Sequence, residues 1–411
     1  MWSLQHVEMY RESRELTHAL LQCMAGLAAD GIEITHLSNR SSRCVRTFLA
    51  APSDVHRLWS ESMTSPFRLQ DVERAVFTLS RRPRALAFPK YPAELADLND
   101  LMRGFVLGAQ RAARVDPRLC ALFYGLSLHE AKIIRSLSSI DLMDMAHHVR
   151  IRLDETQVQR LQQALPPRLR LTPPQALGVA LSVVGCGLAT PGTVANATPG
   201  AAAQEQSLPT RRANAKKVRV RSDELRACLE SQNDRVGALA HLHEKGLKRP
   251  ALQSLRGVTK AELMLSGVGT KIPQDDRRLT MRGTGVLKTL EWNKRAFAQH
   301  ALLLIQMYRA LDPWVRRDIS LDPWAFGVAS DLLGAVRRQH PLSMFHEDQV
   351  LRAYSAGGVE TVRCPFHQLE YLISAGDEDV TIHSVCSRCE LEQGTAQHAD
   401  ASHGSRADKA A

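Results

Sequence analysis

The sequence predicts a mostly α-helical protein with helix-turn-helix-like domains and a small β-hairpin, or knuckle, near the C-terminus. Hydrophobic residues make up 44% of the chain and aromatic residues only 5%, which favours helical cores built from Leu and Ala. Apolar residues recur at helical spacing in several segments. The exception is a short stretch near residues 364–389, where cysteine and histidine cluster between alternating apolar residues.

The first expected domain covers residues 1–65. Leu16, Leu20, Met24 and Leu27 form a helical stripe that ends at Gly31. A second helix with a basic face should follow and carries the arginines Arg40, Arg43 and Arg46. Helix, glycine turn and basic helix together predict a helix-turn-helix-like unit; a plain helical hairpin with a solvated basic face fits equally well.

The next segments are a connector and a second helical domain. Residues 66–92 contain several prolines and basic residues, which indicates a connector. Residues 90–186 predict a helical domain that includes one long amphipathic helix. Residues 149–154 read VRIRLD, and their alternation predicts a short strand.

Two segments lack the apolar residues that a core needs. Residues 187–222 are rich in Ala, Pro, Gly and Thr and should form a flexible, basic linker. Its end, RRANAKKVRVR, holds six basic residues in eleven and no acid; it is either a solvated linker end or an arm that neutralises phosphates. The tail over residues 393–411 should be disordered.

Positive charge is concentrated in the last expected domain, residues 223–392. The chain carries a net charge of +10, and residues 241–295 contain twelve Lys or Arg against five acidic residues. Such a surplus favours nucleic acid or an anionic membrane surface as the partner. Within this stretch, LHEKGLKRPALQSLRGVTKAEL repeats the order of helix, glycine turn and helix expected for residues 1–65.

Cysteine usage and hydropathy predict a cytoplasmic protein. The start of the chain lacks the apolar core of a signal peptide, and the longest apolar run, residues 176–189, is too short to span a bilayer. Five of the eight cysteines are scattered, whereas three lie within 26 residues. This distribution is typical of a reduced protein with one metal site and not of a disulfide framework.

The strongest motif is the pairing of Cys364-x-x-His367 with Cys386-x-x-Cys389. Two pairs of this kind supply the four ligands of a tetrahedral zinc ion, and four protein ligands leave no open position for catalysis. We therefore expect structural zinc, with a hairpin in the spacer between the pairs. His383 is a rival fourth ligand. The alternative is a small reduced core of three cysteines and one histidine.

The sequence contains no motif of an enzyme. It lacks the phosphate-binding loop, the H-E-x-x-H metalloprotease motif, the nucleophile elbow and the dinucleotide fingerprint. His129-Glu130 and His346-Glu347-Asp348 are isolated and are better explained as residues on helix surfaces. We therefore do not expect an enzyme, and an activity on nucleic acid is the least favoured of the alternatives.

Two regions resemble the bacterial flagellar master transcription activator. Residues 98–154, with LFYGLS and HEAKIIRSLSSIDLMDMA followed by RIRL, resemble its D subunit. Residues 225–392 resemble its C subunit, whose zinc site has four cysteines; here His367 replaces one of them, which zinc accepts. The flagellar activator is a ring of separate chains, so a chain that joins both regions is more similar to activators of excision and transfer genes on integrative and conjugative elements.

The resemblance implies a DNA-binding transcription activator whose implied targets are excision and conjugative-transfer genes of a mobile element. The implied partners are double-stranded promoter DNA, RNA polymerase and further copies of the chain, without a membrane. One alternative is an activator of flagellar-type genes. Another is a zinc-ribbon regulator that binds proteins without touching DNA. The candidate phosphate contacts are Arg40, Arg43, Arg46, Lys245, Lys248, Arg249, Arg256 and Lys260.

Overall fold

The described part of the computed structural model is built mainly of helices. The structure describes residues 2–31, 43–70, 72–73, 96–138, 141–142, 150–166, 173–186, 188, 235–247, 249–268, 291–312, 315, 320–337, 346–375, 381–382 and 385–392. We call the described residues up to 188 the N-terminal half and those from 235 onward the C-terminal half. The predicted linker at 187–222 (apart from Leu188) and the tail at 393–411 lie outside the described residues.

The N-terminal half is built on two long helices that pack side by side, α1 (Trp2–Ala29) and α5 (Ala96–Val115). Their close approach depends on Gly108, where a Cβ atom would lie 2.8 Å from Leu16 Cδ1 and 2.6 Å from Tyr124 Oη. Two shorter helices, α6 (Pro117–Tyr124) and α7 (Leu128–Ser136), then pack against α5.

The local sequence sets the ends of α6 and α7. Asp116 caps α6 by accepting a hydrogen bond from the backbone of Arg118. Gly125, at φ +62°, ends the helix in the left-handed conformation that glycine adopts without strain. Ser127 and Glu130 then form a reciprocal capping box that starts α7.

A small two-stranded sheet brings together distant parts of the N-terminal half. Strand β1 (Phe67–Gln70) pairs antiparallel with β2 (Arg150–Leu153), so the strand predicted at 149–154 is confirmed. The prediction that residues 66–92 are only a connector is wrong for residues 67–70. This short stretch is a strand because it pairs with β2, more than 80 residues away. The alternation of residues within the stretch does not predict that pairing.

Helices α2 (Arg43–Leu49) and α3 (Ser53–Trp59) pack against the same core. Trp59 is fully buried and stacks on Phe48 with ring centroids 4.3 Å apart. Its Nε1 donates to the carbonyl oxygens of Leu161 and Leu165, each at 3.2 Å, at the end of α9 (Glu155–Ala164). Residues 1–65 and 90–186, which we expected as two domains, thus contribute to one core; the bounds of these domains stay a prediction.

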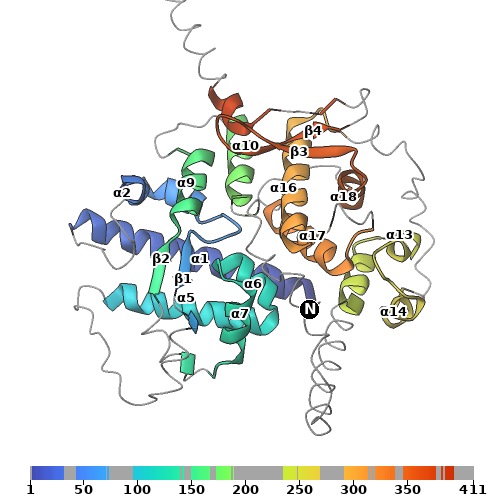
Figure 1. Cartoon of the computed structure of the whole chain (residues 1–411), viewed down its shortest axis with the longest axis horizontal. Coiled ribbons are helices and arrows are strands. Elements are labelled where there is room, and N and C mark those ends of the chain that lie inside the picture. Colours follow the sequence, from blue (N-terminus) through green and yellow to red (C-terminus); the bar gives the residue numbers. More distant parts are fainter. Residues whose placement is uncertain are drawn as a thin grey trace, which may run out of the picture.

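The C-terminal half surrounds one central helix, α16 (Arg295–Leu311), most of whose side chains are buried. Its other elements are a helix over residues 235–244, α13 (Arg249–Gln253), α14 (Lys260–Leu265), α17 (Pro323–Arg337), α18 (Glu347–Ser355), β3 (Val359–Arg363) and β4 (Glu370–Ser374). Strands β3 and β4 form an antiparallel hairpin that crosses over α16 (Figure 1). The predicted fold class, mostly helical with a C-terminal hairpin, is confirmed.

The two halves pack directly on one another. Helix α1 contacts α17, and α10 (Pro173–Val184) contacts α16 (Figure 1). The guanidinium of Arg118 lies 3.2 Å from the centre of the Trp324 ring, a cation–π contact between the halves. Among the described helices, none combines the length and the low polarity that crossing a lipid bilayer would require.

Candidate metal centre

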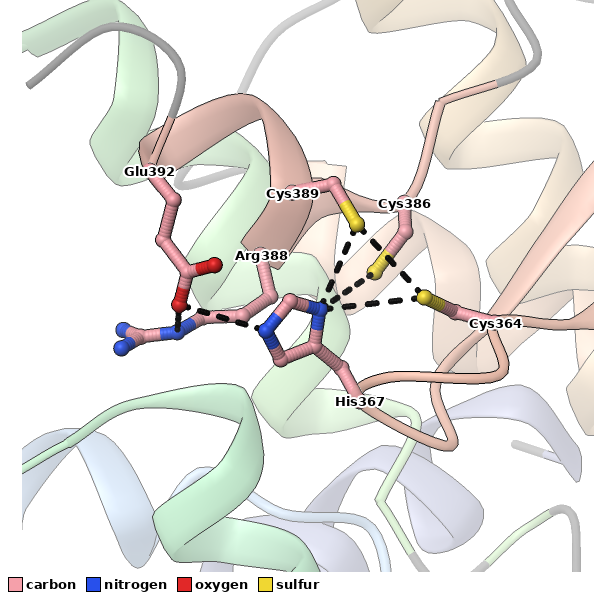
Figure 2. A network of polar contacts seen from close by, with 6 residues as sticks. All are labelled: Cys364, His367, Cys386, Arg388, Cys389 and Glu392. Atoms are coloured by element: carbon pink, nitrogen blue, oxygen red, sulfur yellow. Dashed lines mark hydrogen bonds and ion pairs between the residues drawn. The ribbon is translucent and has the colours of Figure 1, made fainter. Parts of the chain in front are cut away.

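Four predicted ligands come together at the tip of the C-terminal hairpin. Cys364 follows the last residue of β3, and His367 lies in the turn that leads to β4. Cys386 precedes a short helix over residues 387–392 that contains Cys389. The three sulfur atoms and one imidazole nitrogen all lie within 4.8 Å of one another (Figure 2).

The separations of the ligand atoms fit a tetrahedral zinc ion. Zinc–sulfur bonds of about 2.3 Å and zinc–nitrogen bonds of about 2.0–2.1 Å place tetrahedral ligand atoms about 3.5–3.8 Å apart. Nδ1 of His367 lies 3.7 Å from Cys364 Sγ, 3.8 Å from Cys386 Sγ and 3.4 Å from Cys389 Sγ. The sulfurs of Cys364 and Cys389 are 3.5 Å apart, which is too far for a disulfide. The site can therefore hold a metal such as zinc.

A tight backbone turn positions the first ligand pair. The N–H of Cys364 donates to the carbonyl of Leu369, and the N–H of Gln368 donates to the carbonyl of Cys364, both at 2.8 Å. Gln368 has φ +58°, and its side-chain amide donates to the carbonyl of Pro365 at 3.1 Å. These bonds turn the chain through the short connection between β3 and β4.

The hairpin differs from the one predicted. We expected both of its strands in the spacer between the ligand pairs. Residues 370–374 do form a strand, but their partner is Val359–Arg363, before the first ligand; the described residues 381, 382 and 385 are not in a strand. Alternating apolar residues identify a strand but not the strand with which it pairs, because the turn that joins two strands decides their pairing.

Glu392 is a residue of the site that the sequence argument missed. Nε2 of His367 lies 3.2 Å from Oε1 of Glu392, which also accepts a hydrogen bond from Arg388 Nε at 3.0 Å (Figure 2). When Nε2 carries the proton and donates to this carboxylate, Nδ1 presents its lone pair to the three sulfurs, as a metal ligand requires. The available signal was an acid three residues after Cys389, on the same face of a helix.

The three thiols have unequal acidity. Burial raises the pKa of Cys364, but hydrogen bonds from the backbone of His367 and Phe366 outweigh it and lower the pKa to about 7. Burial and the neighbouring sulfur of Cys364 raise the pKa of Cys389 to about 12, and burial also raises the pKa of Cys386. One thiolate therefore forms near neutral pH, and the other two need a cation to stabilise their charge.

Two of the candidate ligands are almost completely buried. Cys364 and Cys386 are only 2% and 3% exposed. If all four bound one zinc ion, three cysteines and one histidine would fill its tetrahedron and leave no position for water or substrate. The rival ligand His383 lies outside the described residues.

The candidate phosphate contacts have different surroundings. Arg40 and Lys248 lie outside the described residues, and Arg43 is the first residue of α2. Arg46 is exposed on α2 and Lys260 on α14, and these two helices lie at opposite sides of the molecule (Figure 1). The structure therefore does not gather all eight residues on one surface.

Two of the candidates make contacts inside the protein. Nζ of Lys245 lies 2.8 Å from Asp331 and 2.7 Å from Ser330 Oγ, both on α17. Arg256 forms an ion pair with Asp312 at 3.1 Å and donates to the carbonyl of Ser320 at 3.0 Å. Both side chains connect elements of the C-terminal half.

The relationship of the chain to known proteins was tested in three ways. Comparison with protein-family models, with curated proteins and with solved structures finds no match.

Proposed function

We propose that the chain is a DNA-binding transcription activator and that α13, α14 and the turn between them form its DNA-reading unit. One observation carries the proposal. The turn is fixed from two sides by arginines, while the basic residues at the starts of both helices remain exposed. A rigid unit with exposed basic ends is what binding to the phosphates of a duplex needs.

Arg235 fixes the unit to the helix over residues 235–244. Its Nη2 donates to the carbonyl of Arg256 at 2.9 Å, and its Nε lies 3.2 Å from Glu262 of α14. The turn also contains Gly257 at φ +62°. Because one guanidinium holds both the turn and the second helix, the angle between them is restricted.

Arg256 fixes the same turn to the core. Its backbone N–H donates to the carbonyl of Leu321 at 2.8 Å, and its side chain forms the ion pair with Asp312. Asp312 is 4% exposed and also accepts a hydrogen bond from Tyr308. Arg256 therefore supports the unit, and the phosphate contacts that we retain in this unit are Arg249 and Lys260.

The outer face of the unit carries groups suited to DNA. Arg249 and Lys260 are exposed at the first positions of α13 and α14. At the other end of α14, Met264 and Leu265 are 72% and 76% exposed. Large apolar side chains this exposed indicate a contact surface, and in the major groove such side chains can pack against the methyl groups of thymine.

The finer parts of the proposal rest on the sequence resemblance. By this resemblance the chain activates excision and conjugative-transfer genes, and flagellar-type genes are the alternative targets. Its proposed partners are RNA polymerase and further copies of the chain. In this proposal zinc holds the hairpin in place on α16.

A second candidate function is a zinc-dependent regulator that binds proteins and not DNA. The observation in its favour is Phe366, which is 82% exposed at the tip of the hairpin between two zinc ligands. Val385, 38% exposed, lies beside the third ligand. Exposed aromatic residues of this kind are common anchors of protein interfaces.

Fluorescence anisotropy with promoter fragments at several salt concentrations tests the first proposal. Affinity should fall steeply with salt, and Arg249→Ala and Lys260→Ala should each reduce the log–log slope by about one. The control is Lys132→Ala, an exposed lysine on α7, which should leave the slope unchanged. Salt-independent or absent DNA binding, together with capture of RNA polymerase that Phe366→Ser abolishes, would favour the second function instead.

A further inference from the structure

A cleft with a volume of about 290 Å³ lies between the two halves of the molecule. Helices α9 and α10 form its wall on the N-terminal side, and α16 and the β3–β4 hairpin form the other wall (Figure 1). A hollow of this size suits a small molecule better than a macromolecular segment. The lining residues show which kind of small molecule fits.

The charged side chains of the lining are already engaged by the protein. Glu370 accepts hydrogen bonds from Arg309 and Gln306, both at 3.2 Å, and Arg363 lies 3.9 Å from the same carboxylate. Arg160, on the opposite wall, also interacts with other groups of the protein. A charged ligand would have to leave water and compete for these engaged groups, so the cleft favours a neutral molecule.

Apolar side chains line the cleft from both halves. Leu181 belongs to α10 and Leu302 to α16, whereas Leu369 and Val385 are direct chain neighbours of the stretch that carries the metal ligands. Leu302 and Leu369 are only partly buried, and Val385 is 38% exposed. Apolar surface that remains open to water inside a hollow favours a ligand with an apolar part that covers it.

A glutamine on α16 favours a ligand that also donates a hydrogen bond. Gln299 lines the cleft one helical turn before Leu302 and Leu303, so its amide lies on the same helix face as these leucines. Its Oε1 is buried and, within the part of the chain that the structure describes, has no hydrogen-bond partner. Buried acceptors are normally paired. The terminal bond of a glutamine side chain has broad rotational freedom, so this oxygen can turn toward the cleft and accept from a ligand.

We propose that the cleft binds a small neutral molecule that carries an N–H or O–H donor beside a short apolar chain. The donor pairs with Oε1 of Gln299, and the chain covers the leucines and Val385. Because the walls come from both halves, the ligand adds contacts between them. This site is separate from α13 and α14, so it stands or falls independently of DNA binding.

Ligand-observed NMR of the zinc-loaded full chain tests the proposal with probes of similar apolar chain. Hexanamide and 1-hexanol are neutral donors, methyl hexanoate is neutral without a donor, and hexanoate and hexylammonium are charged. At least one donor should bind with a Kd of about 1 mM, as expected for so small a ligand. It should bind about tenfold more tightly than the ester or either ion, because only a neutral donor completes Gln299 without losing the hydration of a charge.

The tighter of the two donors shows whether the site prefers an amide or a hydroxyl group. Equal or tighter binding of the ester or of either ion would overturn the proposal. Absence of binding of both donors at about 10 mM would overturn it as well.

Two variants connect the binding to residues of the cleft. Gln299→Leu removes the acceptor at similar side-chain size, so the roughly tenfold preference for the donor over the ester should disappear. Gln159→Trp, at an exposed position of α9 that lines the cleft, should fill part of it and weaken the binding of both donors. The matched controls are Gln5→Leu and Gln5→Trp, at an exposed glutamine on α1, which should bind the probes like the wild type.

Thermal melts establish that each variant folds. Because Gln159 is exposed, its variant should fold even where Gln299→Leu does not, and unchanged donor binding in Gln159→Trp would place the probes outside the cleft. A donor preference that survives in a folded Gln299→Leu variant would equally overturn the proposal.

Discussion

His367 links the metal ligands to the helix beside them. Its Nδ1 faces three sulfur atoms, and its Nε2 faces the carboxylate of Glu392. Arg388 holds that carboxylate from the preceding turn of the helix. The orientation of the imidazole thus depends on a residue that is not itself one of the four candidate ligands.

Replacing Glu392 should weaken the metal site without destroying it. We expect Glu392→Ala to lower zinc affinity about 10- to 100-fold, because the imidazole loses the partner that sets its tautomer and orientation. Cys389→Ser should abolish tight binding, and Glu8→Ala, at an exposed acid on α1, is the control. Competition with a chromophoric chelator measures all three. An unchanged affinity in Glu392→Ala would remove Glu392 from the site.

Zinc binding should release protons, and the number follows from the thiol pKa values. At pH 7.5 Cys364, with a pKa of about 7, is mostly ionised, whereas Cys386 and Cys389 have raised pKa values and are protonated. Zinc needs all three thiolates, so binding should release about two protons. As the pH falls through 7, Cys364 also becomes protonated and zinc affinity should fall more steeply. Calorimetry in buffers of different ionisation enthalpy counts the protons; a count near zero would contradict this assignment.

At the scale of elements, two basic residues near α13 and α14 have different surroundings. Arg256 and Lys260 are only four residues apart, but the first is a structural side chain and the second is exposed. Arg256, in the turn, is paired with the buried Asp312. Lys260, at the first position of α14, is exposed. Both side chains are positively charged, but only the charge of Arg256 contacts the core.

The two residues should therefore respond differently to substitution. Arg256→Ala should lower the free energy of unfolding by about 2 kcal/mol or more, since it removes the arginine that pairs with the buried carboxylate of Asp312. Lys260→Ala should change it by less than about 0.5 kcal/mol. Urea denaturation measures both, and adding Asp312→Asn to Arg256→Ala should recover part of the loss. Equal effects of the two single variants would show that Arg256 is not a structural residue.

At the scale of the whole molecule, the two halves are in direct contact, in addition to being joined by the chain. Helix α1 packs on α17, α10 packs on α16, and Arg118 lies over Trp324. Ser182 and Ser387 add a polar contact between α10 and the metal centre. The halves should therefore recognise one another when they are separate polypeptides.

Co-expression of residues 1–190 and 210–411 tests this expectation. The two fragments should co-purify as a one-to-one complex, and Arg118→Ala should weaken it several-fold through loss of a cation–π contact worth about 1 kcal/mol. The complex should activate the promoter less strongly than the intact chain, because the linker raises the effective concentration of each half. Full activation by 210–411 alone would overturn the two-part activator.

The sequence by itself determined the fold class and the candidate ligands of the possible metal centre, with His367 and His383 left as rivals for the fourth position. Helical periodicity and capping residues act within a few neighbouring residues, so they identify segments such as α1 and α7 from local sequence. The spacing of Cys364 with His367 and of Cys386 with Cys389 is equally local, because two ligands of one pair share one turn.

Only the tertiary structure decided which distant residues meet. The pairing of β1 with β2 and of β3 with β4, the contact of Glu392 with His367 and the burial of Arg256 against Asp312 depend on how elements pack. The same holds for the cleft, whose walls come from both halves. The physical reason is that pairing between remote residues is set by core packing and turn geometry, which leave little trace in the residue types of either partner.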